Sequence, residues 1–329
     1  MDIVVASAAF LVALLCAGTM GFAIQRGATC TVAAVDEVVR ERGVRRLAAL
    51  LEAALWVAGG LLVAQGLQVL PNMPAGYAVG PWTVLGGALL GLGAYVNRAC
   101  VFGAIARFGS GEWAYLVTPL GFYVGCVSVG RVFGAPAPQA LPYGSPVLQA
   151  SAWVALPFAA LALWRLGRPL LDGVRTGRPV AMLAARAWSP HTATTIIGVT
   201  FVVLLLLVGS WAYTDVLVEL ARGMAGSLAA RSLLLLALLG GAALGGWTAG
   251  RYRNTPIAAA QVLRCFVGGL LMGWGSLLIP GGNDGLILVG MPLLWPYAWV
   301  AFATMCVTIA AAMLLGRRHA APAGGHGVP

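Results

Sequence analysis

Residues Arg264 to Trp299 read RCFVGGLLMGWGSLLIPGGNDGLILVGMPLLWPYAW, and this segment indicates what kind of protein the chain forms. It begins as an apolar run long enough for a transmembrane helix, breaks at Ile279-Pro280-Gly281-Gly282, presents Asn283 and Asp284, and returns to apolar residues. The bilayer interior offers no partner for unsatisfied backbone groups, so such a break must be buried in protein or line a wet cavity. Ionisable residues beside a break of this kind mark a functional site. We therefore expect the site here.

The composition of the whole chain agrees with a membrane protein. Of its 329 residues, 60% are hydrophobic and 9% are charged, and the mean hydropathy is +0.90. Soluble domains carry about 25% charged residues, so a soluble protein of this composition would have too little polar surface to cover itself. The apolar runs are long and continuous, which indicates helices rather than a β-barrel. The sequence predicts an all-α polytopic membrane protein.

The charge and the cysteines exclude other classes of protein. The formal net charge is +10, and all twenty basic residues are arginine. Basic residues gather in the cytoplasmic loops of membrane proteins, so this charge does not indicate a nucleic-acid partner. The sequence holds no Cys-x-x-Cys pair and no His-Cys cluster with the spacing of a metal site, so we expect no metal and no other cofactor. Cys16, Cys126 and Cys306 lie within apolar runs and are expected only to pack.

The apolar runs predict about nine transmembrane helices, each near the roughly 20 residues that span a bilayer. They lie at 3–25, 47–70, 81–99, 114–133, 147–165, 192–213, 230–250, 257–279 and 294–316. If the N-terminus is outside, the inner loops hold most of the arginines, and the outer loops hold only Arg222, with Arg131 and Arg231 at nearby helix ends. The positive-inside rule therefore predicts that the N-terminus lies outside and the C-terminus lies in the cytoplasm.

Two inner loops organise the chain. Residues 26–46 begin with small and apolar side chains, so we expect a short re-entrant helix there. Residues 165–191 are rich in Arg, Gly and Pro, and they are predicted to be a cytoplasmic connection between a first transmembrane half, 1–164, and a second half, 192–318. The Gly- and Pro-rich residues 319–329 are predicted to be a disordered cytoplasmic tail.

An internal repeat supports the division into two halves. GGALLGLGA (Gly86 to Ala94) matches GGLLMGWGS (Gly268 to Ser276) at five positions, four of them glycine. In the predicted topology the first copy runs inward and the second outward, which predicts an inverted repeat with the site at its interface, as in many transporters. Glycine-rich packing faces can also recur by chance. Here, however, each copy leads into a polar break, Asn97-Arg98-Ala99-Cys100 in the first and 280–284 in the second.

Three long blocks carry a resemblance to a known family. They are GFAIQRGATC (Gly21 to Cys30), VNRACVFGAIARFGSGEWAYLVTPLGFYVG (Val96 to Gly125) and the segment from Arg264 to Trp299. Over nearly its whole length the chain resembles the YeeE/YedE family of bacterial inner-membrane thiosulfate permeases. The resemblance implies nine main helices with short half-helices entering from both sides. It also implies uptake of thiosulfate for sulfur assimilation along a central path lined by Cys30, Cys100 and Cys265. It leaves open whether a cytosolic sulfur-carrier or sulfurtransferase protein receives the substrate.

The chemistry of thiosulfate suits these residue types. The ion is a small dianion with one soft sulfur and three hard oxygens, and a neutral thiol donates a weak S–H···S hydrogen bond without trapping it. The N-terminal ends of half-helices offer partial positive charge and free N–H groups to the oxygens. Arg264 either places a full charge near the path or extends to the membrane edge, and Asp284 is expected to cap a short helix. The further candidates at or beside the breaks are Thr29, Asn97, Arg264, Ser276, Asn283 and Asp284.

Two other functions remain open at this point. A transporter of a related sulfur or selenium anion would share these features, and only an uptake assay separates it from a thiosulfate permease. A membrane thiol enzyme would need an activated thiolate or a cofactor site. The sequence has no haem or flavin motif, and His191 lies at the start of a predicted helix, not within the membrane.

Overall fold

The structure, a computed structural model, describes residues 7–134, 137–175, 185–223 and 228–320. These residues form helices, and their one β feature is an isolated bridge between Tyr77 and Ala140. The expected tail at 319–329 lies outside the described residues from position 321 onward. The all-α polytopic class predicted from the sequence is confirmed.

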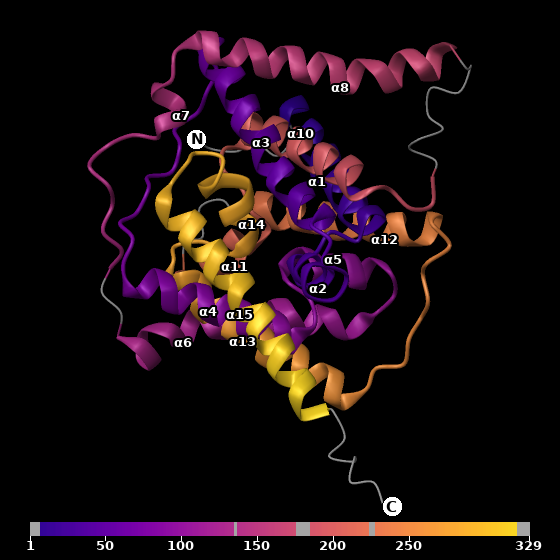
Figure 1. Ribbon diagram of the computed structural model, residues 1–329, viewed down its shortest axis with the longest axis vertical. Helices are drawn as coiled ribbons and strands as arrows, with labels where there is room; N and C mark the ends of the chain where they lie inside the picture. Colours follow the sequence, from indigo (N-terminus) through magenta and orange to yellow (C-terminus); the bar gives the residue numbers. More distant parts are fainter. Residues whose placement is uncertain (1–6, 135–136, 176–184, 224–227, 321–329) are drawn as a thin grey trace, which may run out of the picture.

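The described residues form long helices separated by short ones (Figure 1). The long helices are α1 (Ala8–Gly27), α3 (Arg45–Gly66), α4 (Pro81–Asn97), α6 (Val117–Phe133), α8 (Ala155–Arg175), α10 (Pro190–Val208), α12 (Leu228–Thr248), α13 (Ala259–Leu278) and α15 (Pro296–Ala320). The short ones are α2 (Thr31–Glu41), α5 (Val101–Gly109), η1 (Trp113–Leu116), α7 (Pro146–Gln149), η2 (Ala152–Val154), α11 (Tyr213–Ala221), α14 (Asn283–Gly285) and the π-helix η3 (Leu286–Gly290). The order long, short, long, long, short, long occurs twice, first over α1–α6 and again over α10–α15, where α14 and η3 together fill the second short place.

Two packed layers of helices lie on either side of four short helices, α2, α5, α11 and α14. α13 packs on α6 and α4, and α15 packs on α4; α1 packs on α12 and α10, and α10 packs on α3. Figure 1 shows α4, α6, α13 and α15 together in the lower part of the view, with α2, α5, α11 and α14 between them and the upper helices. The first residues of these four helices, Thr31, Val101, Tyr213 and Asn283, are buried in protein, as broken helices at membrane depth require.

The chain breaks have identifiable backbone causes. α1 ends because Ala28 adopts the left-handed conformation (φ 47°), and α4 ends at Arg98 in the same way (φ 58°). α10 ends at Gly209 (φ 84°), so the helix predicted at 192–213 stops earlier than expected and restarts as α11. α13 ends just before Pro280, whose ring cannot continue a helix.

Eight helical segments of the described chain are long and apolar enough to span a membrane, compared with the nine or so predicted. The difference lies at 147–165, where the structure has α7, then η2, then α8, whose apolar part covers Ala155–Gly167. Pro157 explains this start, because proline is tolerated in the first turn of a helix and not in its interior. α8 also continues to Arg175, so residues 165–175 of the expected connection are helical.

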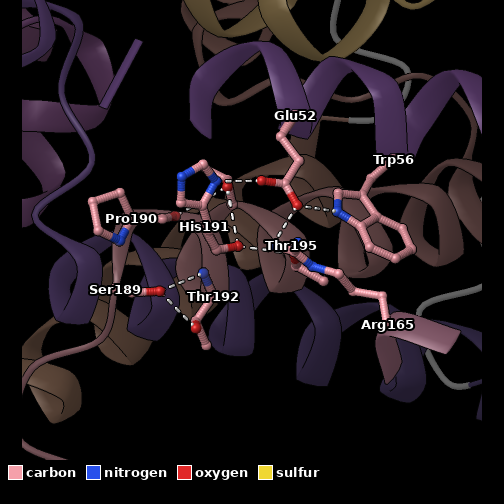
Figure 2. Close-up of polar contacts among 9 residues, drawn as sticks. Glu52, Trp56, Arg165, Ser189, Pro190, His191, Thr192 and Thr195 are labelled. Atoms are coloured by element: carbon pink, nitrogen blue, oxygen red, sulfur yellow. Dashed lines mark hydrogen bonds and ion pairs between the residues drawn. The ribbon is translucent and has the colours of Figure 1, made fainter. Parts of the chain in front are cut away.

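A polar cluster attaches α8 to the bundle. Figure 1 shows α8 along the upper edge of the molecule. The Arg165 guanidinium lies 2.8 Å from a carboxylate oxygen of Glu52 in α3, and His191 at the start of α10 contacts the other carboxylate oxygen (Figure 2). The indole of Trp56 also donates to Glu52, at 3.3 Å. One acidic side chain thus joins three helices.

Candidate functional site

Four of the short helices start at chain breaks that meet inside the molecule. Cys30 precedes α2, Cys100 precedes α5, Ala212 precedes α11 and Gly282 precedes α14, each as the N-cap residue with an extended backbone. The first turn of a helix has N–H groups without intrahelical partners. Hydrogen bonds join these first turns to one another.

Asn283 joins three of the breaks. Its side-chain oxygen accepts a hydrogen bond from the Val101 N–H at 3.3 Å, and its side-chain nitrogen donates to the Thr31 hydroxyl at 3.4 Å. The Thr31 N–H donates to the sulfur of Cys100 at 3.1 Å, which closes a ring of contacts. All four side chains are buried. Asn283 therefore contacts two segments that lie 182 and 252 positions earlier in the sequence.

Asp284 joins the fourth break. Its carboxylate accepts from the Thr214 N–H at 3.1 Å and from the Thr214 hydroxyl at 2.6 Å. Thr214 lies in the first turn of α11, so the carboxylate caps a short helix, which is the role expected for it from the sequence. It caps a helix that lies 70 positions earlier in the same half of the chain.

Two of the three predicted path cysteines lie together. Cys100 is fully buried, and Cys30 is half-buried directly beside α5. A Cβ added at Gly103 of α5 would lie 2.5 Å from the Cys30 sulfur, so only glycine leaves room for this thiol. Both cysteines are N-cap residues of half-helices whose N–H groups face the same junction.

Two cavities containing arginines lie beside this junction. The larger has a volume of about 810 Å³ and is lined by Cys30, Asp36 and several arginines. The smaller, of about 220 Å³, is lined by Cys265, Asn97 and Glu112. Arg98, Arg107 and Arg264 line both cavities. Cys265 thus opens toward the same basic space as Cys30, while Cys100 lies more deeply buried behind Cys30.

The sequence profile of the family described as "Sulphur transport" matches residues 26–311, a range that holds all three cysteines and all four breaks. The chain belongs to this family. A search of curated protein sequences found no significant match. Membership in the sulphur transport family supports a membrane protein that carries a sulfur compound.

The other cysteines of this sulphur transport protein lie within long helices rather than at the breaks. All six cysteines are free. Cys126 packs in the contact between α6 and α13, with its sulfur 3.8 Å from the Gly273 carbonyl oxygen, while Cys16 lies in α1 and Cys306 in α15. Their places agree with the packing role predicted for them.

The remaining sequence candidates have different surroundings. Asn97 donates to the Ala99 carbonyl at 2.9 Å and accepts from the Thr118 hydroxyl at 3.1 Å, so it closes the α4 break. The hydroxyls of Thr29 and Ser276 are buried and have no hydrogen-bond partner among the described residues. Arg264 is half-exposed and lines both cavities rather than the junction.

Three contributors were missed in the sequence. Thr31 and Thr214 each lie in the first turn after a break, where a hydroxyl and a free N–H meet the neighbouring segment. Arg98 was named as part of the polar break at 97–100, but not as a candidate site residue. The neighbouring Asn97 and the preceding glycine-rich run predicted the break. They did not predict that Arg98 lines a cavity.

Proposed function

We propose that this sulphur transport protein takes up thiosulfate along a path through Cys100, Cys30 and Cys265. The observation that carries the proposal is the pair of thiols, Cys30 and Cys100, at the point where half-helix N-termini converge. This point adjoins a cavity lined by arginines and by Cys30. Thiols for the soft sulfur, and N–H and guanidinium groups for the hard oxygens, are therefore offered to one small ion at the same place.

The thiols and N–H groups divide the recognition of thiosulfate between them. A neutral thiol donates a weak hydrogen bond to the terminal sulfur, and the ion can leave because the bond is weak. N–H groups in the first turns of α2 and α5 offer partial positive charge to the oxygens. Cys100 lines neither arginine-lined cavity, whereas Cys30 lines the larger one and Cys265 lines the smaller one. In the proposed topology these cavities face the cytoplasm, because arginines gather on that side of bacterial membranes.

The glycine repeat supports two halves related by a pseudo-two-fold axis. A Cβ added at Gly86 would lie 2.8 Å from the Gly275 carbonyl oxygen, and one added at Gly93 would lie 2.6 Å from that of Gly268. In the repeat, Gly86 corresponds to Gly268 and Gly93 to Gly275. Each copy therefore contacts the other in the same manner, as in an isologous contact between subunits. We propose that 1–164 and 192–318 form these halves.

The decisive experiment measures what the protein transports. The full chain is expressed in a bacterial host that lacks its own thiosulfate and sulfate uptake, and growth on thiosulfate as the sole sulfur source is followed. Uptake of labelled thiosulfate into proteoliposomes is measured with sulfate and selenite as competitors. We expect growth on thiosulfate and weak competition by sulfate, because sulfate lacks the soft sulfur. Absence of both growth and uptake by the wild-type protein would overturn the proposal.

A related sulfur or selenium anion is the second candidate. The converging helix ends and the arginine-lined cavities would receive any small oxyanion. Selenite that competes as strongly as unlabelled thiosulfate, with little growth on thiosulfate, would favour this candidate.

A further inference from the structure

The two arginine-lined cavities contain more positive charge than their own acids neutralise. Five arginines line the larger cavity, and three of them are paired with a carboxylate. The pairs are Arg40 with Asp36 at 2.5 Å, Arg46 with Glu37 at 3.5 Å and Arg107 with Glu112 at 3.2 Å. Arg98 and Arg264 have no ion pair or hydrogen bond from their side chains to any described residue, and both line both cavities.

Arg98 occupies a position where the backbone favours another residue. It adopts φ 58° and ψ 18°, a left-handed conformation that glycine and asparagine adopt with least cost. The end of α4 is closed by main-chain bonds, from the Arg98 N–H to the Tyr95 and Ala94 carbonyls, which any residue except proline could make. The guanidinium is exposed to the cavity and has no structural partner. Its presence is therefore explained better by the cavity than by the helix end.

Arg264 approaches the same space from α13. It directly precedes Cys265, which is buried, whereas Leu263 on its other side is 63% exposed. The arginine thus lies where the smaller cavity, with Cys265, adjoins the larger cavity, with Cys30. The acids that line these cavities, Asp36 and Glu112, are already bound to Arg40 and Arg107.

We propose that Arg98 and Arg264 form a binding site for a small tetrahedral dianion at the junction of the two cavities, between Cys30 and Cys265. A guanidinium matches two oxygens of an oxyanion with two parallel N–H donors. The site recognises charge and oxygens, so it accepts sulfate and thiosulfate alike, and selection for soft sulfur is left to the thiols. Because Arg98 is exposed and the larger cavity is wide, salt screens the interaction, and the ion is held weakly enough to leave. The inference depends on the proposed function only for the identity of the transported ion.

The test is equilibrium binding of labelled sulfate to the full chain in lipid nanodiscs, at low and at high ionic strength. The variants are Arg98→Gln and Arg264→Gln, with Arg42→Gln as the matched control. Arg42 has the same charge and a left-handed conformation (φ 55°), but it lines neither cavity. Loss of one charged hydrogen-bond donor should weaken binding by about tenfold or more. Size-exclusion profiles and thermal unfolding show whether each variant is folded.

We expect both cavity variants to lose sulfate affinity, the control to keep it, and wild-type binding to weaken as salt rises. Unchanged affinity in both cavity variants would overturn the site, and so would an equal loss in Arg42→Gln, which would indicate a general charge effect. Thiosulfate uptake by the same proteins separates this inference from the proposed function. Normal uptake by the wild type with unchanged sulfate binding in the cavity variants rejects the site alone. No thiosulfate uptake by the wild type, together with lost sulfate binding in the variants, rejects the transport proposal and keeps the site.

Discussion

The six cysteines differ in what surrounds each sulfur, as the sequence already indicated by placing three of them at or beside polar breaks and three within apolar runs. Cys100 accepts a hydrogen bond from the Thr31 N–H, and Cys30 fits against Gly103 where no Cβ would leave room. Cys265 lines a cavity that it shares with three arginines. The sulfur of Cys126, by contrast, lies 3.8 Å from a carbonyl oxygen in a helix contact. Under the proposed function, Cys30, Cys100 and Cys265 meet the transported ion, and the other three cysteines only pack.

This difference predicts the result of a serine and alanine scan. Alanine removes the weak donor, and serine keeps a donor but loses the softness of sulfur. Both changes at Cys30, Cys100 or Cys265 should lower thiosulfate uptake, with alanine at roughly a tenfold loss, the size of one hydrogen bond to a charged group. The readouts are initial uptake rate and growth on thiosulfate, with the amount of protein in the membrane measured alongside.

The control positions are Cys16, Cys126 and Cys306, where alanine should leave uptake near normal. Equal losses at all six positions would indicate folding defects instead of a path. Full activity of Cys265→Ala would remove that thiol from the mechanism.

At the scale of helices, glycines set how closely α4, α6, α13 and α15 approach one another. A Cβ at Gly91 would lie 2.6 Å from the Met305 carbonyl oxygen in α15, and one at Gly273 would lie 2.2 Å from that of Phe122 in α6. These two glycines occupy the same place in the two copies of the repeat. The obstacle in each case is backbone, which cannot move aside as a flexible side chain can.

Leucine at Gly91 or Gly273 should therefore destabilise the protein, by roughly 1–3 kcal/mol from overpacking, and lower uptake. Gly240→Leu in α12 is the matched control, because no atom lies within 4 Å of a Cβ placed there and the residue is exposed. Thermal unfolding in detergent and the yield of monodisperse protein measure the effect. Wild-type behaviour of both repeat variants would show that these helices do not need glycine to pack.

The helices also show how far sequence reasoning extends. The apolar runs located most of the long helices, and the polar, glycine-rich segments located the breaks before Cys100 and Asn283. The break at Gly209 was missed because the residues on both sides are apolar, and the span at 147–165 was wrong in its course because Pro157 and Ala150 divide it. The contact of Asn283 with Thr31 and Val101 could not be predicted, since it joins residues separated by 252 and 182 positions.

At the scale of the whole molecule, the arginines and the repeated order of helices bear on orientation. The long, short, long, long, short, long order occurs in each half, and α8 lies between the two occurrences. The arginine distribution favours a periplasmic N-terminus and a cytoplasmic C-terminus. Eight spans would leave both termini on one side, so this orientation requires the shorter apolar part of α8, Ala155–Gly167, to cross the membrane as a ninth span.

Reporter fusions test this orientation directly. A fusion after Arg318 should report the cytoplasm, and one inserted in the loop at 134–146 should report the periplasm, with a third at 252–256 reporting the cytoplasm as an internal control. The readout is the ratio of a periplasm-active to a cytoplasm-active reporter at each position. If the first two fusions report the same side, α8 does not cross the membrane and the proposed topology is wrong.

The contact between α4 and α13 has a mechanical consequence. A Cβ at Gly86 would lie 2.8 Å from the Gly275 carbonyl oxygen and one at Gly93 would lie 2.6 Å from that of Gly268, so the two backbones approach closely at both ends of the shared segment. Turning one half of the molecule against the other would separate both of these close contacts. We expect α4 and α13 to keep the same position relative to each other during transport. The proposed path for the ion would then open and close through side chains and short segments around the four breaks. The long helices on either side of these breaks would not slide past one another.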